Sequence, residues 1–262
     1  MGRGRAARKA GPGAFNRRLG QGALYCGEKE TGMSDDLPPS GALPSAGRPL
    51  LGLTVLAVED SRFACEALRL LCLRSGARLR RADCLGAARR HLRAYRPHAV
   101  IVDLGLPDGR GEALIGALHR REPRPAVVLG SSGDDGAKLR ALRAGADGFL
   151  AKPVASLSAF QQAILSRIND PARHALRALH DETVHPDPLA LRDDLLHAAA
   201  MLAGRPDGAA LDYAAQFLRG LARAAQDHGL EQAAGWLDAR DAGGLGRARG
   251  LLQARIRAAA RV

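Results

Sequence analysis

The sequence has few aromatic residues and few cysteines, and no long uncharged apolar run. Aromatics make up 3% of the 262 residues, so there is little material for a surface that stacks the bases of single-stranded nucleic acid. The four cysteines have neither CxxC spacing nor the density of a disulfide scaffold. No uncharged apolar run reaches the ~18 residues of a membrane helix. We therefore expect a soluble, cytoplasmic protein with no membrane partner.

Lysine is also scarce, because only four of the 39 basic residues are lysines and the rest are arginines. The formal net charge of +12 suggests a nucleic-acid partner. The excess is uneven, however: much of it lies in the first 32 residues, and residues 171–262 are close to neutral. Biased composition accounts for such a charge as readily as a DNA-binding surface does.

Residues 1–48 predict a disordered leader. The segment is rich in Gly, Pro and Arg and shows no apolar periodicity with which to offset the entropy of ordering. Met33 is followed by a short acidic, Pro-rich stretch and is a candidate for the true start of translation. The leader is excluded from the fold prediction in either case.

Residues 49–170 alternate between short apolar runs and stretches with helical periodicity. This alternation predicts βαβ crossovers, and therefore a doubly wound α/β fold with a five-stranded parallel sheet. The expected strands cover residues 53–58, 77–82, 98–102, 126–129 and 148–151. The expected helices cover residues 61–75, 85–95, 112–121, 137–144 and 157–168.

The ends of these strands carry the polar residues. Strand one ends in Glu59 and Asp60, strand three in Asp103, strand four in two serines, and strand five runs into Lys152. Carboxyl ends of parallel strands meet at one sheet edge, where such folds bind ligands. Three carboxylates gathered there need a cation, and hard oxygen ligands suit Mg²⁺. A carboxylate beside a metal, a hydroxyl and an ammonium group can act as a nucleophile toward phosphorus.

Three motifs then resemble the receiver domain of bacterial two-component response regulators. They are VLAVED at residues 55–60, VIVDLGLPDG at 100–109 and AGADGFLAKP at 144–153, and the resemblance covers about residues 50–170. It implies a flavodoxin-like fold in which Asp103 accepts a phosphoryl group. Asp60 and Asp103 would hold Mg²⁺ with the Gly105 carbonyl, and Glu59 would be the outer acidic residue.

The resemblance also assigns residues around the acceptor. Lys152 would pair with the phosphoryl group, through a cis bond to Pro153, and Phe149 falls on the switch aromatic position. The switch hydroxyl is Ser131 by counting from the strand, with Ser132 as the alternative.

Residues 171–187 predict a linker, which Pro171, Pro186 and the adjacent Pro188 mark and which has room for a short helix over residues 172–179. Beyond it, residues 188–262 predict an all-α four-helix bundle, with Gly and Pro between the helical stretches. These stretches cover residues 189–202, 209–226, 230–239 and 245–260.

The second of these stretches, AQFLRGLA at residues 215–222, looks like a histidine-containing phosphotransfer (HPt) domain. Arg219 and Gly220 match that family's basic residue and its glycine. The phosphorylatable histidine is replaced by Gln216, and a carboxamide cannot accept a phosphoryl group. We expect Gly220 to permit close approach, either of an incoming receiver or of a packed neighbouring helix.

Three functions follow as hypotheses. The first is a response regulator, not an enzyme beyond self-phosphotransfer and autodephosphorylation. It would be phosphorylated by a histidine kinase or phosphotransfer protein, with the helical module as a docking output for a receiver, a kinase or a second copy.

The second hypothesis is a DNA-binding regulator that uses a basic receiver face, which the near-neutral charge of the helical output module disfavours. The third is an active phosphorelay intermediate that uses His197 or His228.

Overall fold

The computed structural model describes residues 43–170, 173, 176, 181–240 and 243–259. Most of the predicted leader, with Met33, lies outside the described residues. Its last part is not wholly irregular, because Ser45 and Arg48 pair in a short antiparallel bridge. Among the described residues, none of the helices combines the length and apolar character that crossing a bilayer requires.

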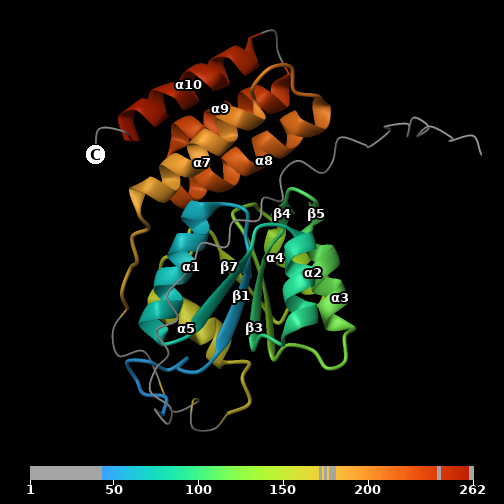
Figure 1. The fold of residues 1–262 in the computed structure, drawn as a ribbon, viewed down its shortest axis with the longest axis vertical. Coiled ribbons are helices and arrows are strands. Elements are labelled where there is room, and N and C mark those ends of the chain that lie inside the picture. Colours follow the sequence, from blue (N-terminus) through green and yellow to red (C-terminus); the bar gives the residue numbers. More distant parts are fainter. Residues whose placement is uncertain (1–42, 171–172, 174–175, 177–180, 241–242, 260–262) are drawn as a thin grey trace, which may run out of the picture.

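Five strands form a parallel sheet in the order β2-β1-β3-β6-β7, which confirms the predicted α/β fold (Figure 1). The two central strands β1 and β3 are almost entirely buried and apolar, as strands covered on both faces must be. Their positions differ from those predicted by only a few residues. The strands are β1 (Thr54–Val58), β2 (Arg78–Ala82), β3 (Ala99–Asp103), β6 (Val127–Ser132) and β7 (Gly148–Ala151).

Helices cover both faces of the sheet and bury one apolar cluster against each. On one face lie α1 (Arg62–Ser75) and α5 (Leu157–Leu165). On the other lie α2 (Leu85–Ala94), α3 (Gly111–His119) and α4 (Ala137–Arg143). Local sequence sets the ends of α1: the Ser61 side chain accepts the Ala64 N–H, and Gly76 ends the helix with φ 80°.

A small hairpin, β4 (Gly105–Leu106) and β5 (Gly109–Arg110), follows β3, and Asp108 lies in its turn. The Asp108 carboxylate also accepts two N–H groups at the start of α2. Asp134 and Asp135 do not cap α4, whose N-cap is Gly136 without a side-chain hydrogen bond.

The C-terminal part is helical, as predicted, and comprises α7 (Pro188–Met201), α8 (Gly208–Ala225), α9 (His228–Ala239) and α10 (Gly244–Ala259). We call residues 188–259 the helical region. Asp187, Asp207 and Asp227 cap α7, α8 and α9 through their side chains. The helices share one apolar cluster, which also includes Phe63 from α1.

The helical region lies over the carboxyl edge of the sheet, with α7 and α8 against the start of α1 (Figure 1). The end of the predicted linker is attached to the α/β region. Backbone bonds join Leu157 N to Glu182 O at 2.9 Å and Val184 N to Ala155 O at 3.0 Å. Val184 is buried in the cluster between the sheet and α1 and α5. Part of the predicted linker thus packs as part of the α/β region.

Candidate metal and phosphoacceptor site

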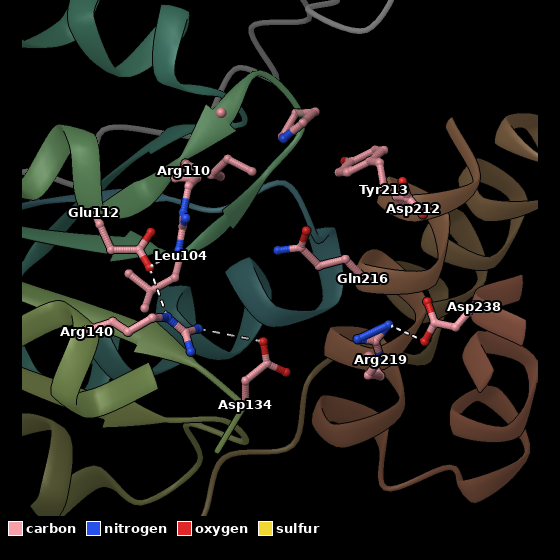
Figure 2. A pocket seen from close by; sticks show the side chains of 13 residues that line it. Leu104, Arg110, Glu112, Asp134, Arg140, Asp212, Tyr213, Gln216, Arg219 and Asp238 are labelled. Atoms are coloured by element: carbon pink, nitrogen blue, oxygen red, sulfur yellow. Dashed lines mark hydrogen bonds and ion pairs between the residues drawn. The ribbon is translucent and has the colours of Figure 1, made fainter. Parts of the chain in front are cut away.

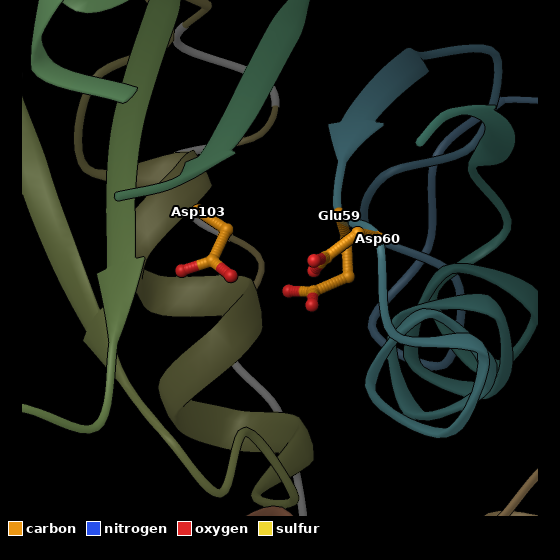
Figure 3. A group of neighbouring side chains, drawn as sticks. All are labelled: Glu59, Asp60 and Asp103. Atoms are coloured by element: carbon orange, nitrogen blue, oxygen red, sulfur yellow. The ribbon is translucent and has the colours of Figure 1, made fainter. Parts of the chain in front are cut away.

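The structure brings the three predicted acidic residues together at the carboxyl edge. Glu59 and Asp60 follow β1, and Asp103 ends β3, the neighbouring strand. Each offers a carboxylate oxygen that lies within 4.8 Å of the other two, and the carboxylates face one another (Figure 3).

Lys152 lies between two of these carboxylates. Its Nζ is 2.9 Å from Asp103 Oδ2 and 2.8 Å from Glu59 Oε2. The Lys152 side chain is 6% exposed, so the ammonium group is paired in a desolvated setting where such contacts are strong. The predicted cis bond between Lys152 and Pro153 is confirmed.

Burial and mutual repulsion disfavour full ionisation of the cluster. Desolvation and the neighbouring carboxylates raise the pKa of Glu59 to about 8, although the Lys152 ammonium group acts to lower it. Desolvation and Asp103 raise the pKa of Asp60 to about 7. The same acids raise the pKa of Lys152, despite its burial. Such a cluster gains stability from a further cation.

The donor set fits Mg²⁺. The carboxylate oxygens of Glu59, Asp60 and Asp103 are the hard ligands that this ion takes, and they are gathered at the carboxyl edge of the sheet. Gly105, whose carbonyl the sequence assigned to the metal, is half-buried in β4, and its N–H contacts Asp103 Oδ1 at 3.3 Å. The cluster is therefore consistent with a magnesium site.

The two candidate switch serines differ in position. Ser131 is the register partner of Asp103 across β3 and β6, so both side chains lie on the same face of the sheet. Its hydroxyl donates to the Leu150 carbonyl at 3.1 Å. Ser132 faces the other way, and its Oγ accepts the Asp134 N–H. Phe149, the predicted switch aromatic, is half-buried and packs on the cluster under α2, α3 and α4.

Sequence reasoning missed a side chain from the helical region that reaches the acidic cluster. The Tyr213 hydroxyl, on α8, donates to Asp60 Oδ2 at 2.6 Å. Burial and the neighbouring carboxylates raise the pKa of Tyr213, so it stays a proton donor. Tyr213 lies three residues before Gln216, so helical periodicity places both side chains on one face of α8. Nothing local indicated that this face meets Asp60.

The expected HPt position also faces the α/β region. Gln216 extends from α8 toward the β4–β5 hairpin, beside a cavity of about 570 Å³ (Figure 2). A Cβ added at Gly105 would overlap the far end of the Gln216 side chain, so the amide lies directly against the Gly105 backbone. Arg219 is directed to Asp238 of α9, at 2.8 Å.

A Cβ added at Gly220 would meet no atom within 4 Å, so no neighbouring helix packs closely against this glycine. The approach of an incoming receiver at Gly220 stays a prediction. The close approaches to glycine lie instead on the α/β side of the interface. Besides Gly105, these include Gly133, where an added Cβ would overlap the Arg223 side chain.

Asp194 of α7 is a second residue that the sequence did not single out. It is 1% exposed, and it accepts the Ser61 hydroxyl at 2.7 Å and the N–H groups of Arg62 and Phe63 at 2.9 and 3.0 Å. It thus supplies hydrogen-bond acceptors at the N-terminus of α1, immediately after the acidic pair. Desolvation raises its pKa above the usual range.

The two alternative histidines of the helical region lie in different surroundings. His197 is half-buried, and its ring packs edge-on against Phe217 at 5.4 Å between centroids. The His228 side chain is 95% exposed at the start of α9, with Glu231 at 3.7 Å.

Comparison with known proteins identifies the α/β region. Residues 55–164 match the family model of the response regulator receiver domain. The sheet order and the acidic edge agree with that match, so this part of the chain is a receiver domain of the two-component response regulator type. The match does not extend to the helical region.

Curated relatives share the receiver part. The KDP operon transcriptional regulatory protein KdpE of Escherichia coli K12 is 33% identical over 141 residues, 54% of this chain and 58% of that protein. A protein-glutamate methylesterase/protein-glutamine glutaminase of Anaeromyxobacter dehalogenans is 32% identical over 172 residues, 62% of this chain and 49% of that protein. The chain thus spans about half the length of these relatives.

A solved structure of a response regulator from Chloroflexus aurantiacus is 31% identical, with a TM-score of 0.37. The aligned part covers 38% of this chain and 85% of the solved chain.

Proposed function

We propose that this protein is a response regulator in which Asp103 accepts a phosphoryl group and thereby changes the contacts of the helical region. The observation that carries this proposal is the placement of Lys152 between Asp103 and Glu59, beside Asp60. One ammonium group and a site for a cation then lie where negative charge develops during phosphoryl transfer.

In the proposed reaction an Asp103 carboxylate oxygen forms a bond to phosphorus. The bond from phosphorus to the donor breaks, and its electron pair leaves with the donor group, a histidine nitrogen or the carboxylate of acetyl phosphate. Lys152 stabilises charge on the transferred oxygens. Glu59, Asp60 and Asp103, with the Gly105 carbonyl, would hold Mg²⁺, which when bound neutralises phosphoryl charge.

Ser131 is the better of the two switch candidates, because it shares the face of Asp103. Its hydroxyl would exchange the Leu150 carbonyl for a phosphoryl oxygen, and Phe149 would move with it. The chain would act as a phosphoacceptor with at most self-phosphotransfer and autodephosphorylation, not as an enzyme toward another substrate.

The helical region would act as a degenerate HPt-like module. Gln216 stands where that family has its histidine, and the module is docked on a receiver edge, as a phosphotransfer protein would need to be. Its partners in this proposal are proteins: a histidine kinase or phosphotransfer protein as donor, and a receiver, a kinase or a second copy as target.

The proposal is tested by incubating the protein with acetyl phosphate and Mg²⁺ and measuring the phosphorylated fraction by gel retardation or intact mass. We expect one base-labile phosphoryl group in the natural chain and none in Asp103→Asn. Asp108→Asn is a matched control at the same edge, whose carboxylate caps α2, and it should label normally. Undiminished labelling of Asp103→Asn contradicts the proposal.

DNA binding is a second candidate, because KdpE is named as a transcriptional regulatory protein. The basic residues of the receiver supply charge for it, but Arg81 is committed to the carbonyl groups of Glu59 and Asp60. Salt-dependent retardation of a promoter fragment that exceeds retardation of random DNA would favour this function.

A further inference from the structure

We propose that Tyr213 competes with the metal ion for Asp60, so that the docked helical region keeps the receiver in a state of low metal affinity. The inference rests on the proposed function, because it takes the acidic cluster as the metal site. It adds a means by which one part of the chain controls the other.

Both carboxylate oxygens of Asp60 already accept hydrogen bonds. Tyr213 donates to Oδ2 at 2.6 Å, and the Ser61 N–H donates to Oδ1 at 3.0 Å. Arg81 also binds the Asp60 carbonyl at 2.7 Å, which fixes the backbone. A metal ion at Asp60 must therefore share or displace the tyrosine hydroxyl, and metal affinity falls by the strength of that charge-assisted bond.

The docked position of α8 delivers this hydroxyl. The ring of Tyr213 lies 6.3 Å from that of Phe217, which belongs to the core of the helical region. Farther along α8, Arg223 pairs with Asp134 of the receiver at 2.5 Å. Asp194 of α7 is bonded to the first turn of α1. Two contacts with the receiver, those of Arg223 and Asp194, thus hold the helical region where Tyr213 reaches Asp60, and Phe217 supports the tyrosine ring.

The coupling must act in both directions, since linkage between two binding equilibria is reciprocal. A metal ion that displaces the Tyr213 hydroxyl removes the hydrogen bond between Tyr213 and Asp60, which is a further contact between the two regions, and thereby weakens docking. Conversely, any partner that draws the helical region away frees Asp60 for the metal. Phosphorylation of Asp103, which needs the metal, would then be gated by the helical region.

The test is Mn²⁺ binding, because Mn²⁺ takes the same hard oxygen ligands and free Mn²⁺ is counted by its EPR signal. Tyr213→Phe removes the hydroxyl and keeps the ring on Phe217. We expect it to bind Mn²⁺ roughly tenfold more tightly than the natural chain. Tyr95→Phe is the matched control, because its hydroxyl contacts His91 on α2, and it should leave the affinity unchanged.

Arg223→Ala is a second variant, which leaves the Tyr213 hydroxyl in place but loosens docking, and it should tighten Mn²⁺ binding by a smaller factor. Equal or weaker binding by Tyr213→Phe overturns this inference while leaving the proposed function intact. Absence of binding in every variant, at metal concentrations that saturate ordinary receivers, overturns both.

Discussion

Asp103 and Asp194 are both buried carboxylates at the interface between the receiver and the helical region, and they are stabilised in different ways. Asp103 is 7% exposed, pairs with the Lys152 ammonium group and lies among other acids. Asp194 is 1% exposed and is satisfied by backbone N–H groups and one hydroxyl. The first arrangement leaves repulsion that a cation or a reaction can relieve. The second leaves nothing to gain from a ligand.

The receiver and the helical region differ in the same way as these two carboxylates. The receiver places its acids and its lysine where they face the interface, whereas the helical region offers a phenol, a carboxamide and a structural carboxylate at that interface. In the proposed function, the reacting groups thus all belong to the receiver, whereas the helical region covers the acidic edge. Each prediction below tests whether that division is real.

The largest effect is expected from Gln216→His, which places an imidazole where the helical region has an amide. The Gln216 side chain lies against Gly105, two residues from Asp103, so phosphoryl exchange between the two becomes possible. After treatment with acetyl phosphate we expect an acid-labile, base-stable phosphoryl group that the natural chain lacks.

The control for this gain is Gln216→His combined with Asp103→Asn, which should lose the acid-labile label. If Asp103 is labelled and the introduced histidine never is, then the helical region differs from a phosphotransfer domain in more than one residue.

A smaller effect is expected from Asp194→Ala. It leaves the Ser61 hydroxyl proton and the Phe63 N–H without their acceptor at a buried position, which costs about 2–3 kcal/mol of unfolding free energy. Urea denaturation measures this loss. Asp193→Ala is the matched control on the same helix, since its pair with Arg62 is half-exposed and contributes less than about 1 kcal/mol. Equal losses for the two variants would show that Asp194 does not anchor the interface.

The smallest effect concerns pH. His98 Nδ1 accepts the Thr54 N–H at 3.0 Å, and burial, with Arg173 nearby, holds the pKa of His98 below its ordinary value of 6.5. Below pH 6.5 the unfolded chain binds more protons than the folded one, so this contribution to stability is present above pH 6.5 and is lost as pH falls through the folded pKa.

Denaturation midpoints between pH 5 and 8 should therefore fall less steeply on acidification in His98→Gln than in the natural chain. His228→Gln is the counterpart in the helical region, where the side chain is 95% exposed, and its pH profile should match the natural one. If the midpoint fell less steeply on acidification in His228→Gln than in His98→Gln, the pH dependence would belong to the helical region and the interpretation of His98 would be wrong.

Local sequence was sufficient to predict most elements to within a few residues. Strands such as β3 are continuous apolar runs, and α1 has a serine cap and a terminal glycine, which are signals within a few residues of the element itself. The small β4–β5 hairpin was missed, because two-residue strands carry no periodicity. The acidic edge followed from one further rule, that parallel strands end together.

Residues that act across the interface were not predictable. The motif at Gly220 gave no indication that, within this chain, side chains of the helical region lie directly against Gly105 and Gly133. Tyr213 and Asp194 carry no motif at all, and they contact residues 153 and 133 positions away. Such contacts depend on how two packed bodies meet, which no local pattern encodes.

The sequence by itself determined a five-stranded parallel sheet with Glu59, Asp60, Asp103 and Lys152 at one edge, because strands alternate with helices along the chain and the carboxyl ends of parallel strands meet at one edge. Only the tertiary structure decided the order of the strands, that the helical region covers this edge and that Tyr213 reaches Asp60. That outcome depends on shape, on the burial of Phe63 and on long-range hydrogen bonds such as those of Asp194.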